Sequence, residues 1–196
     1  MRTSTHVRRQ PKKNRGGGLS AERDWEEMLV GDASASLCGA LQQWLPSRRW
    51  FRSKTRIIES VRIQEQIPVA IKPQKAVLLL FEVNFTEGDP ESYVIPLASA
   101  FGQKAKEICR DWPQMIIAEV SLNGPRRTGI LYDAIVSKVF CHSLLVLIAH
   151  RQKVVGQIGD LEAEPTGVLR RIQREKGLNM EPSVSKAILR LFTVAA

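Results

Sequence analysis

The stretch that decides the fold reads KAVLLLFEVNF and spans residues 75–85. Large apolar side chains occupy every second position, which is the period of one face of a β-strand. They are Val77, Leu79, Phe81, Val83 and Phe85. Leu78 and Leu80 make the first half apolar on its other face as well. Because a strand that is apolar on both faces needs cover on both, the pattern predicts a central strand.

The sequence on either side of this strand predicts its neighbours in a sheet. After a loop at residues 86–91, which contains Gly88 and Pro90, Tyr93, Ile95 and Leu97 alternate again. This pattern predicts an antiparallel hairpin. Residues 56–64 alternate imperfectly on the N-terminal side and predict a strand with a kink or bulge, which we expect Pro68 to end.

A second hairpin is predicted further along the chain. Residues 115–122 and 128–132 have strand-like alternation and are separated by the turn sequence Asn123-Gly124-Pro125. The chain therefore supplies four or five antiparallel strands.

Three segments have helical periodicity. Residues 34–45 carry apolar side chains on one helical face and are followed by Pro46. Residues 101–112 allow either a short helix or an ordered excursion between the two hairpins. A long helix is predicted from residue 133 to about residue 153, with an apolar stripe that includes Val136, Phe140 and Leu144. We expect an α+β fold in which the helices pack on one face of an antiparallel sheet, similar in outline to a cystatin-like fold.

Charge and composition suggest two flanking regions. The formal charge is +9, but residues 1–18 hold six cations and no acid, so the rest of the chain carries only +3. This tail has almost no apolar residues, and we expect residues 1–18 to be disordered. Residues 19–155 are expected to form the main domain. Three glycines and Glu164-Pro165 interrupt the pattern of residues 156–196, which we interpret as an incomplete connecting unit.

The cysteines and histidines provide no candidate catalytic, cofactor-binding or metal-binding residue, and the common phosphate-binding motifs are absent from the sequence. Cys38, Cys109 and Cys141 are widely spaced and are best interpreted as buried small apolar residues. Cys141-His142 and His150 lack a second pair of ligands to close a zinc site. The sequence contains no G-x-x-x-x-G-K-[ST] loop and no G-x-G-x-x-G fingerprint. It also has no apolar run of the length that a signal peptide or membrane span requires, so we expect a cytoplasmic protein without a membrane partner.

The segment between the first helix and the first long strand is unusually dense in cations and aromatic rings. We call residues 48–54 the anchor segment; its candidate residues are Arg48, Arg49, Trp50, Phe51 and Lys54. The rings could fasten the helix to the strand, stack on nucleic-acid bases, or grip a neighbouring domain. Nucleic acid is disfavoured by the near-neutral charge of the body. A Trp50→Ala change should cost about 3–5 kcal/mol if that ring is buried and below about 1 kcal/mol if it is exposed.

Three blocks of the sequence, taken in their order along the chain, resemble a known protein family. They are WLPSRRWFRSK at residues 44–54, LLLFEV with ESYVIPLA at residues 78–83 and 91–98, and TGILYDA at residues 128–134. Together they resemble the N-terminal cap domain of bacterial maltokinases, which also occurs in fusions behind trehalose synthase. The resemblance covers about residues 35–150. Residues 156–178 are similar to the connection that leads from the cap to the kinase lobe.

This resemblance implies a role in ATP-dependent phosphorylation of maltose to maltose 1-phosphate, on the route from trehalose to glycogen-like α-glucan. ATP and magnesium are expected for the complete family enzyme, and the implied partner is a kinase catalytic lobe or a trehalose synthase-type domain. The HGD-type catalytic loop and the DFE-type metal motif of that lobe are absent from this sequence. We therefore expect a cap that binds no cofactor and is inactive alone. The alternatives are a maltokinase subunit that gains activity on assembly with a separate kinase lobe, and a stand-alone basic module for nucleic acid.

Overall fold

The structure, a computed structural model, describes residues 18–70, 75–123 and 127–176. Six strands form one sheet in the spatial order β1-β5-β6-β4-β3-β2. Their bounds are β1 Leu19–Ala21, β2 Ile58–Ala70, β3 Lys75–Phe85, β4 Glu91–Phe101, β5 Ile116–Leu122 and β6 Arg127–Asp133. All neighbours pair antiparallel except β1, which runs parallel to β5. The predicted α+β class is confirmed.

The strand β3 lies inside the sheet between β4 and β2, as its sequence predicts. Its two apolar faces enter different cores. Val77, Leu79 and Phe81 pack in a first core, whereas Ala76 and Leu78 pack in a second core on the opposite face. The alternation in the sequence therefore separates two hydrophobic clusters.

Helices cover both faces of the sheet, which corrects the expectation that they pack on one. Helix α1, at Ala33–Trp44, contributes Leu37 and Leu41 to the first core. Helices α2, at Gly102–Asp111, and α3, at Lys138–Ala149, contribute to the second core. The physical reason is that the central strands are apolar on both faces. A single layer of helices would leave one apolar face of the sheet exposed to water.

The first long strand continues beyond the predicted stop. β2 runs through Pro68, which pairs with Val77 of β3, and its register shifts between Ile58 and Ser60 and between Ile63 and Glu65. The predicted bulge is confirmed, but the prediction that Pro68 ends the strand is wrong. β2 is the edge strand of the sheet, and an edge strand tolerates proline because one side of its backbone has no ladder to maintain.

The long helix of the sequence prediction is shorter in the structure. A 3₁₀ turn at Ala134–Val136 precedes α3, and the Oγ of Ser137 accepts a hydrogen bond from the backbone N–H of Phe140 at 3.3 Å. Phe140 and Leu144 of the predicted stripe are buried, whereas Val139 beside them is exposed. The helix ends before residue 153 because Arg151 adopts a positive φ of 50°, which turns the chain into the next strand.

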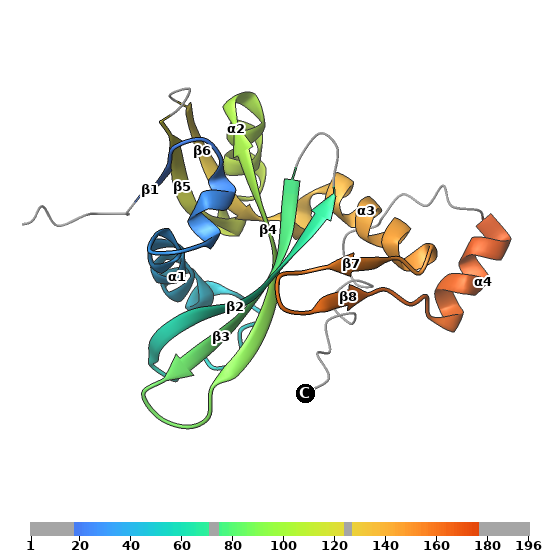
Figure 1. The fold of residues 1–196 in the computed structure, drawn as a ribbon, viewed down its shortest axis with the longest axis horizontal. Coiled ribbons are helices and arrows are strands. Elements are labelled where there is room, and N and C mark those ends of the chain that lie inside the picture. The colour runs from blue at the N-terminus through green and yellow to red at the C-terminus, as the bar shows by residue number, and fades with distance from the viewer. Residues whose placement is uncertain (1–17, 71–74, 124–126, 177–196) are drawn as a thin grey trace, which may run out of the picture.

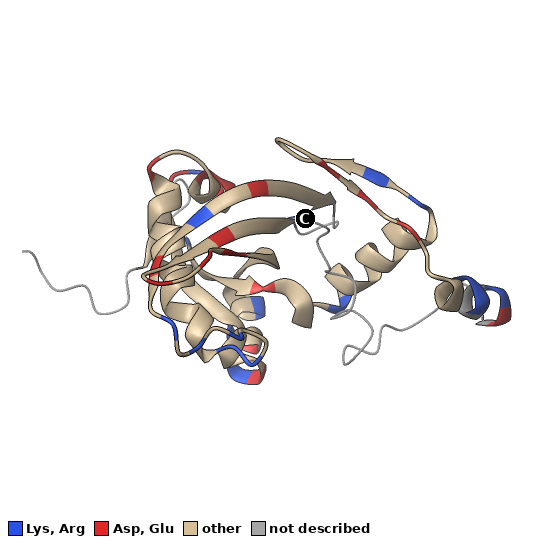
Figure 2. Ribbon diagram, turned by 90° about the horizontal axis from the view of Figure 1, so that it is seen from below, with Lys and Arg blue, Asp and Glu red and all other residues tan. Residues whose placement is uncertain are grey.

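A small hairpin and a last helix complete the described chain. β7, at Lys153–Val155, pairs with β8, at Asp160–Glu162, and α4 follows at Gly167–Lys176. Figure 1 shows the tip of this hairpin beside the middle of the sheet and α4 at the far end of the molecule. The proposed division after Val155 falls inside this hairpin. Lysine and arginine gather along α4 (Figure 2), and none of the described helices is long and apolar enough to cross a membrane.

Several sequence predictions fall on residues outside the described ranges. They are the disorder of the basic tail up to residue 17, the turn at residues 124 and 125, and the last part of the connecting unit, residues 177–196.

Candidate functional site

The anchor segment connects a 3₁₀ turn at Leu45–Ser47, directly after α1, to β2. Its five candidate residues separate into two groups. Arg48 and Phe51 are buried, with 9% and 1% of their surface exposed, and Trp50 is half-buried against the first core. Arg49 and Lys54 are exposed. The segment therefore has an inner layer that packs and an outer layer of cations.

Arg48 is held by groups from three parts of the chain. Its Nη2 donates to the Oγ of Ser47 at 2.7 Å, and its Nη1 donates to the backbone carbonyl of Gln114. Its guanidinium lies 4.6 Å from the centre of the Trp44 ring. The indole N–H of Trp44 donates to the same Gln114 carbonyl at 3.2 Å. Arg48 thus fastens the end of α1 to the segment that precedes β5, at a distance of 66 residues in the sequence.

Asp133, at the end of β6, is a buried carboxylate near this arginine. It is 4% exposed and accepts a hydrogen bond from the backbone N–H of Ile135 at 3.0 Å. Burial raises the pKa of Asp133 to about 6, against the opposing effects of the Ile135 hydrogen bond and the positive charge of Arg48. Burial also lowers the pKa of Arg48, and the charge of Asp133 opposes this shift. The attraction between the two opposite charges reduces the free-energy cost of burying each of them.

Aromatic rings surround the inner layer of the anchor segment. Trp50 contacts Trp44 and Tyr93 with ring centres 5.9 Å and 5.8 Å apart, and Phe51 contacts Tyr93 and Phe85 at 5.3 Å and 6.4 Å. These contacts join the end of α1 to β3 and β4. The rings bury a large apolar area; the Phe51–Phe85 pair is stacked and the other three pairs are tilted or edge-on.

A polar cluster that the sequence analysis missed secures the far end of the segment. Glu91 accepts from the Oγ of Ser53 at 2.6 Å, from Arg56 at 2.9 Å and from the Tyr93 hydroxyl. Although burial would raise the pKa of Glu91, these three donors together hold it below its usual range. The hydroxyl of Tyr93 has a raised pKa because it is buried and beside this carboxylate. Glu91 therefore ties the anchor segment to the start of β4.

Arg56 also holds the β3–β4 loop. Its Nη2 donates to the carbonyls of Glu87 and Asp89 at 2.8 Å and 2.7 Å, and its guanidinium lies 3.6 Å from the centre of the Phe85 ring. A Cβ added to Gly88 would lie 2.9 Å from the Arg56 Nη2. The only sequence signal for this arrangement is a glycine in the loop, which does not indicate its partner.

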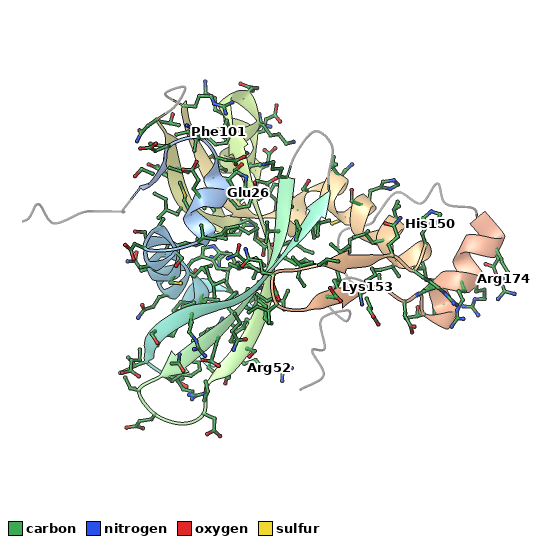
Figure 3. The ribbon with its side chains drawn as sticks, viewed as in Figure 1. Glu26, Arg52, Phe101, His150, Lys153 and Arg174 are labelled. Carbon is green, nitrogen blue, oxygen red and sulfur yellow. The ribbon has the colours of Figure 1, made fainter. Side chains whose placement is uncertain are left out.

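The cysteines and histidines are spread over the fold. Cys141 is buried and donates to the carbonyl of Ile135 at 3.2 Å, while Cys38 is half-buried. The prediction that all three cysteines are buried is wrong for Cys109 of α2, which is exposed. His142 is exposed beside the buried Cys141, and Figure 3 shows His150 at the end of α3. Within the described ranges, no group of three His, Cys, Asp or Glu side chains could hold a metal ion.

Comparison with known proteins gives one family. No curated protein matches the chain. Residues 44–136 match the sequence model described as the maltokinase N-terminal cap domain. The matched range begins at the end of α1, contains the whole anchor segment and the strands β2 to β6, and ends in the 3₁₀ turn before α3. Residues 44–136, which make up just under half of the chain, are therefore similar to the maltokinase N-terminal cap domain.

Proposed function

We propose that this chain is the cap of a maltokinase-type protein and takes part in the ATP-dependent phosphorylation of maltose to maltose 1-phosphate. The kinase lobe that carries out the transfer would be supplied by the same or by a separate chain. The observation that carries the proposal is the family match over residues 44–136, which includes the anchor segment and the strands β3 and β4 that its rings contact.

The described residues do not fit the binding of ATP and magnesium. Phosphoryl transfer needs cations and metal ions around the phosphates and a residue that positions the nucleophile. The carboxylate of Glu91 and the guanidinium of Arg56 are engaged with each other, and Asp133 and Arg48 are buried. Chemistry is therefore assigned to the kinase lobe, and the cap acts through contact with it.

The exposed cations of the anchor segment are proposed as that contact. Arg49 and Lys54 project from a backbone that the buried Arg48 and Phe51 hold in place. Arginine is favoured at protein interfaces because its planar guanidinium pairs with carboxylates and stacks on rings. In this proposal the inner layer sets the shape of the segment and the outer layer pairs with acidic groups of the lobe.

An assay of ADP release in the presence of maltose, ATP and magnesium tests the proposal. The 196-residue chain alone should give no turnover above a blank, and adding a maltokinase catalytic lobe that lacks its own cap should give turnover that depends on this chain. Turnover by the chain alone would overturn the assignment of chemistry to the lobe. Arg49→Glu should weaken the effect of the added chain, whereas Arg23→Glu, an exposed charge outside the anchor segment, should not.

A further inference from the structure

One buried carboxylate joins two parts of the chain that the sequence separates widely. Glu65 of β2 is 7% exposed. It lies next to the register shift between Ile63 and Glu65, where the regular pairing of β2 with β3 is interrupted. A bulge of this kind re-aims a side chain, and here the carboxylate meets the turn between β7 and β8.

The carboxylate of Glu65 accepts four backbone N–H groups. Its Oε1 accepts from Gln66 at 2.7 Å and from Gln157 at 2.8 Å. Its Oε2 accepts from Ile158 at 2.7 Å and from Gly159 at 2.6 Å. Three of the four donors belong to one turn and lie 92–94 residues away in the sequence. Burial alone would raise the pKa of Glu65, but the four donors outweigh it and hold the pKa below its usual range, so the group is charged at neutral pH.

The turn is shaped to admit this carboxylate. The N–H of Gly156 donates to the carbonyl of Gly159 at 2.8 Å and closes the turn around Glu65. A Cβ on Gly156 would lie 2.6 Å from the Gly159 carbonyl oxygen and 2.9 Å from the Oε1 of Glu65. Only glycine leaves room for both, because these separations are too short for any side chain.

Other contacts of the turn are fewer and weaker. The Nε2 of Gln157 donates to the Oε1 of Gln66 at 3.5 Å, and Gln66 in turn donates to the carbonyl of Leu29 at 2.6 Å. The side chain of Ile158 is 85% exposed. Among the described residues, the tip of the hairpin therefore depends mainly on Glu65 for its attachment to the sheet.

We propose that Glu65 is a latch, in which one carboxylate fastens the β7–β8 turn to the edge strand of the cap and makes the cap and the connecting segment one body. With the latch closed, the hairpin opens only when the sheet opens. With the latch removed, the hairpin opens by itself while the six-stranded sheet stays folded. The latch is a property of this chain's own residues and does not rest on the proposed function.

Amide hydrogen exchange of the full chain tests the latch, with Glu65→Gln as the first variant. The Nε2 of glutamine is a donor and cannot accept from Ile158 and Gly159. Loss of charge-assisted hydrogen bonds should speed exchange in residues 156–160 by about ten- to a hundredfold, with exchange in β3 unchanged. The matched control is Glu82→Gln, a β3 carboxylate that accepts from Arg62 and Gln64 and not from the hairpin.

A second variant keeps the proposal testable if Glu65→Gln fails to fold. Gly156→Ala leaves the Glu65 carboxylate in place but sets a Cβ against it and against the Gly159 carbonyl, so this variant should release the hairpin to a similar extent. The double variant should exchange no faster than either single one, because both remove the same attachment. Unchanged exchange of residues 156–160 in Glu65→Gln or Gly156→Ala, an equal rise in the hairpin and β3, or additive effects in the double variant would each overturn the latch.

Discussion

At the scale of single residues, the buried charges are the most informative feature of this domain. Arg48 and Asp133 approach each other from the end of α1 and the end of β6, and each finds neutral backbone partners as well. An unpaired charge in such a place would cost several kcal/mol. The pair therefore links stability to pH.

The raised pKa of Asp133 predicts a loss of stability on going from about pH 4 to pH 6. The folded protein holds this proton more tightly than the unfolded chain, because the pKa is about 6 when folded and ordinary when unfolded. The stabilising effect of the proton is complete below the unfolded pKa and is lost as pH rises through the folded one. Asp133→Asn should remove this contribution, so the variant should gain about 2–3 kcal/mol relative to the wild type between pH 4 and 7.

Urea unfolding at several pH values measures this difference. Asp89→Asn, at an exposed position of the β3–β4 loop, is the control and should follow the wild type. Parallel profiles for wild type and Asp133→Asn would contradict the prediction.

The rings of the anchor segment should differ in their contribution to stability. Phe51 is 1% exposed between Phe85 and Tyr93, so Phe51→Ala should lower the free energy of unfolding by about 3–5 kcal/mol. Trp50 is half-buried, and Trp50→Ala should cost about 1–3 kcal/mol, less than the full burial considered from sequence.

Denaturant unfolding of both variants checks this order, with Arg52→Ala as the exposed control (Figure 3). A larger loss for Trp50 than for Phe51 would be incompatible with the packing described here.

At the scale of elements, the β3–β4 hairpin shows how a loop is fixed by a distant side chain. The sequence of the loop allows several conformations, and Arg56 selects one through the carbonyls of Glu87 and Asp89. Gly88 has a φ of 81° and lies under the guanidinium. The conformation of the loop is therefore determined by its contact with Arg56 as much as by its own residues.

Two glycine substitutions separate backbone strain from this contact. Gly88→Ala and Gly102→Ala both place a side chain at positive φ, which costs about 1–2 kcal/mol. A Cβ on Gly102 has nothing within 4 Å, whereas one on Gly88 meets Arg56. Gly88→Ala should therefore destabilise the protein more than Gly102→Ala.

Thermal unfolding measures both variants, and the test is repeated after Arg56→Ala. The extra loss at Gly88 should disappear in that background. Equal losses of thermal stability for the two glycine variants in the wild-type background would contradict this prediction. They would show that the Arg56 guanidinium moves aside without a measurable loss of stability.

At the scale of the whole molecule, the connecting segment is part of the folded body. Ala163, after β8, is buried in the second core, and Leu161 packs against it. Together with the Glu65 contacts, this packing extends the domain beyond the division after Val155 that the sequence suggests. Gly156, one of the three glycines that interrupt the sequence pattern, is needed by the turn that attaches the hairpin, because a Cβ there would have no room.

Truncation should show where the folded unit ends. A chain ending at Val155 should be about 2–4 kcal/mol less stable than one ending at Lys176, because Glu65 then keeps its charge without three of its donors and the second core loses Ala163. Chemical unfolding of the two truncated chains gives the comparison. Equal stability would mean that residues 156–176 do not contribute to the domain.

Local patterns in the sequence determined much of this protein. The alternation in residues 75–85 predicts β3, and the helical face of residues 34–45 predicts α1, because both patterns arise from neighbours along the chain. The blocks around the anchor segment also predict the family that residues 44–136 match.

The tertiary structure alone decided which core each face enters and which groups meet across the fold. No local pattern connects Arg48 with the Gln114 carbonyl, Glu91 with Arg56, or Glu65 with a turn more than 90 residues away. These contacts depend on the order of strands in the sheet, on the bulge in β2 and on burial, because a buried polar group is destabilising unless it is hydrogen-bonded. The periodicity of apolar residues along the chain specifies the helices and strands. The loss of water around polar groups in the packed protein determines which of them pair.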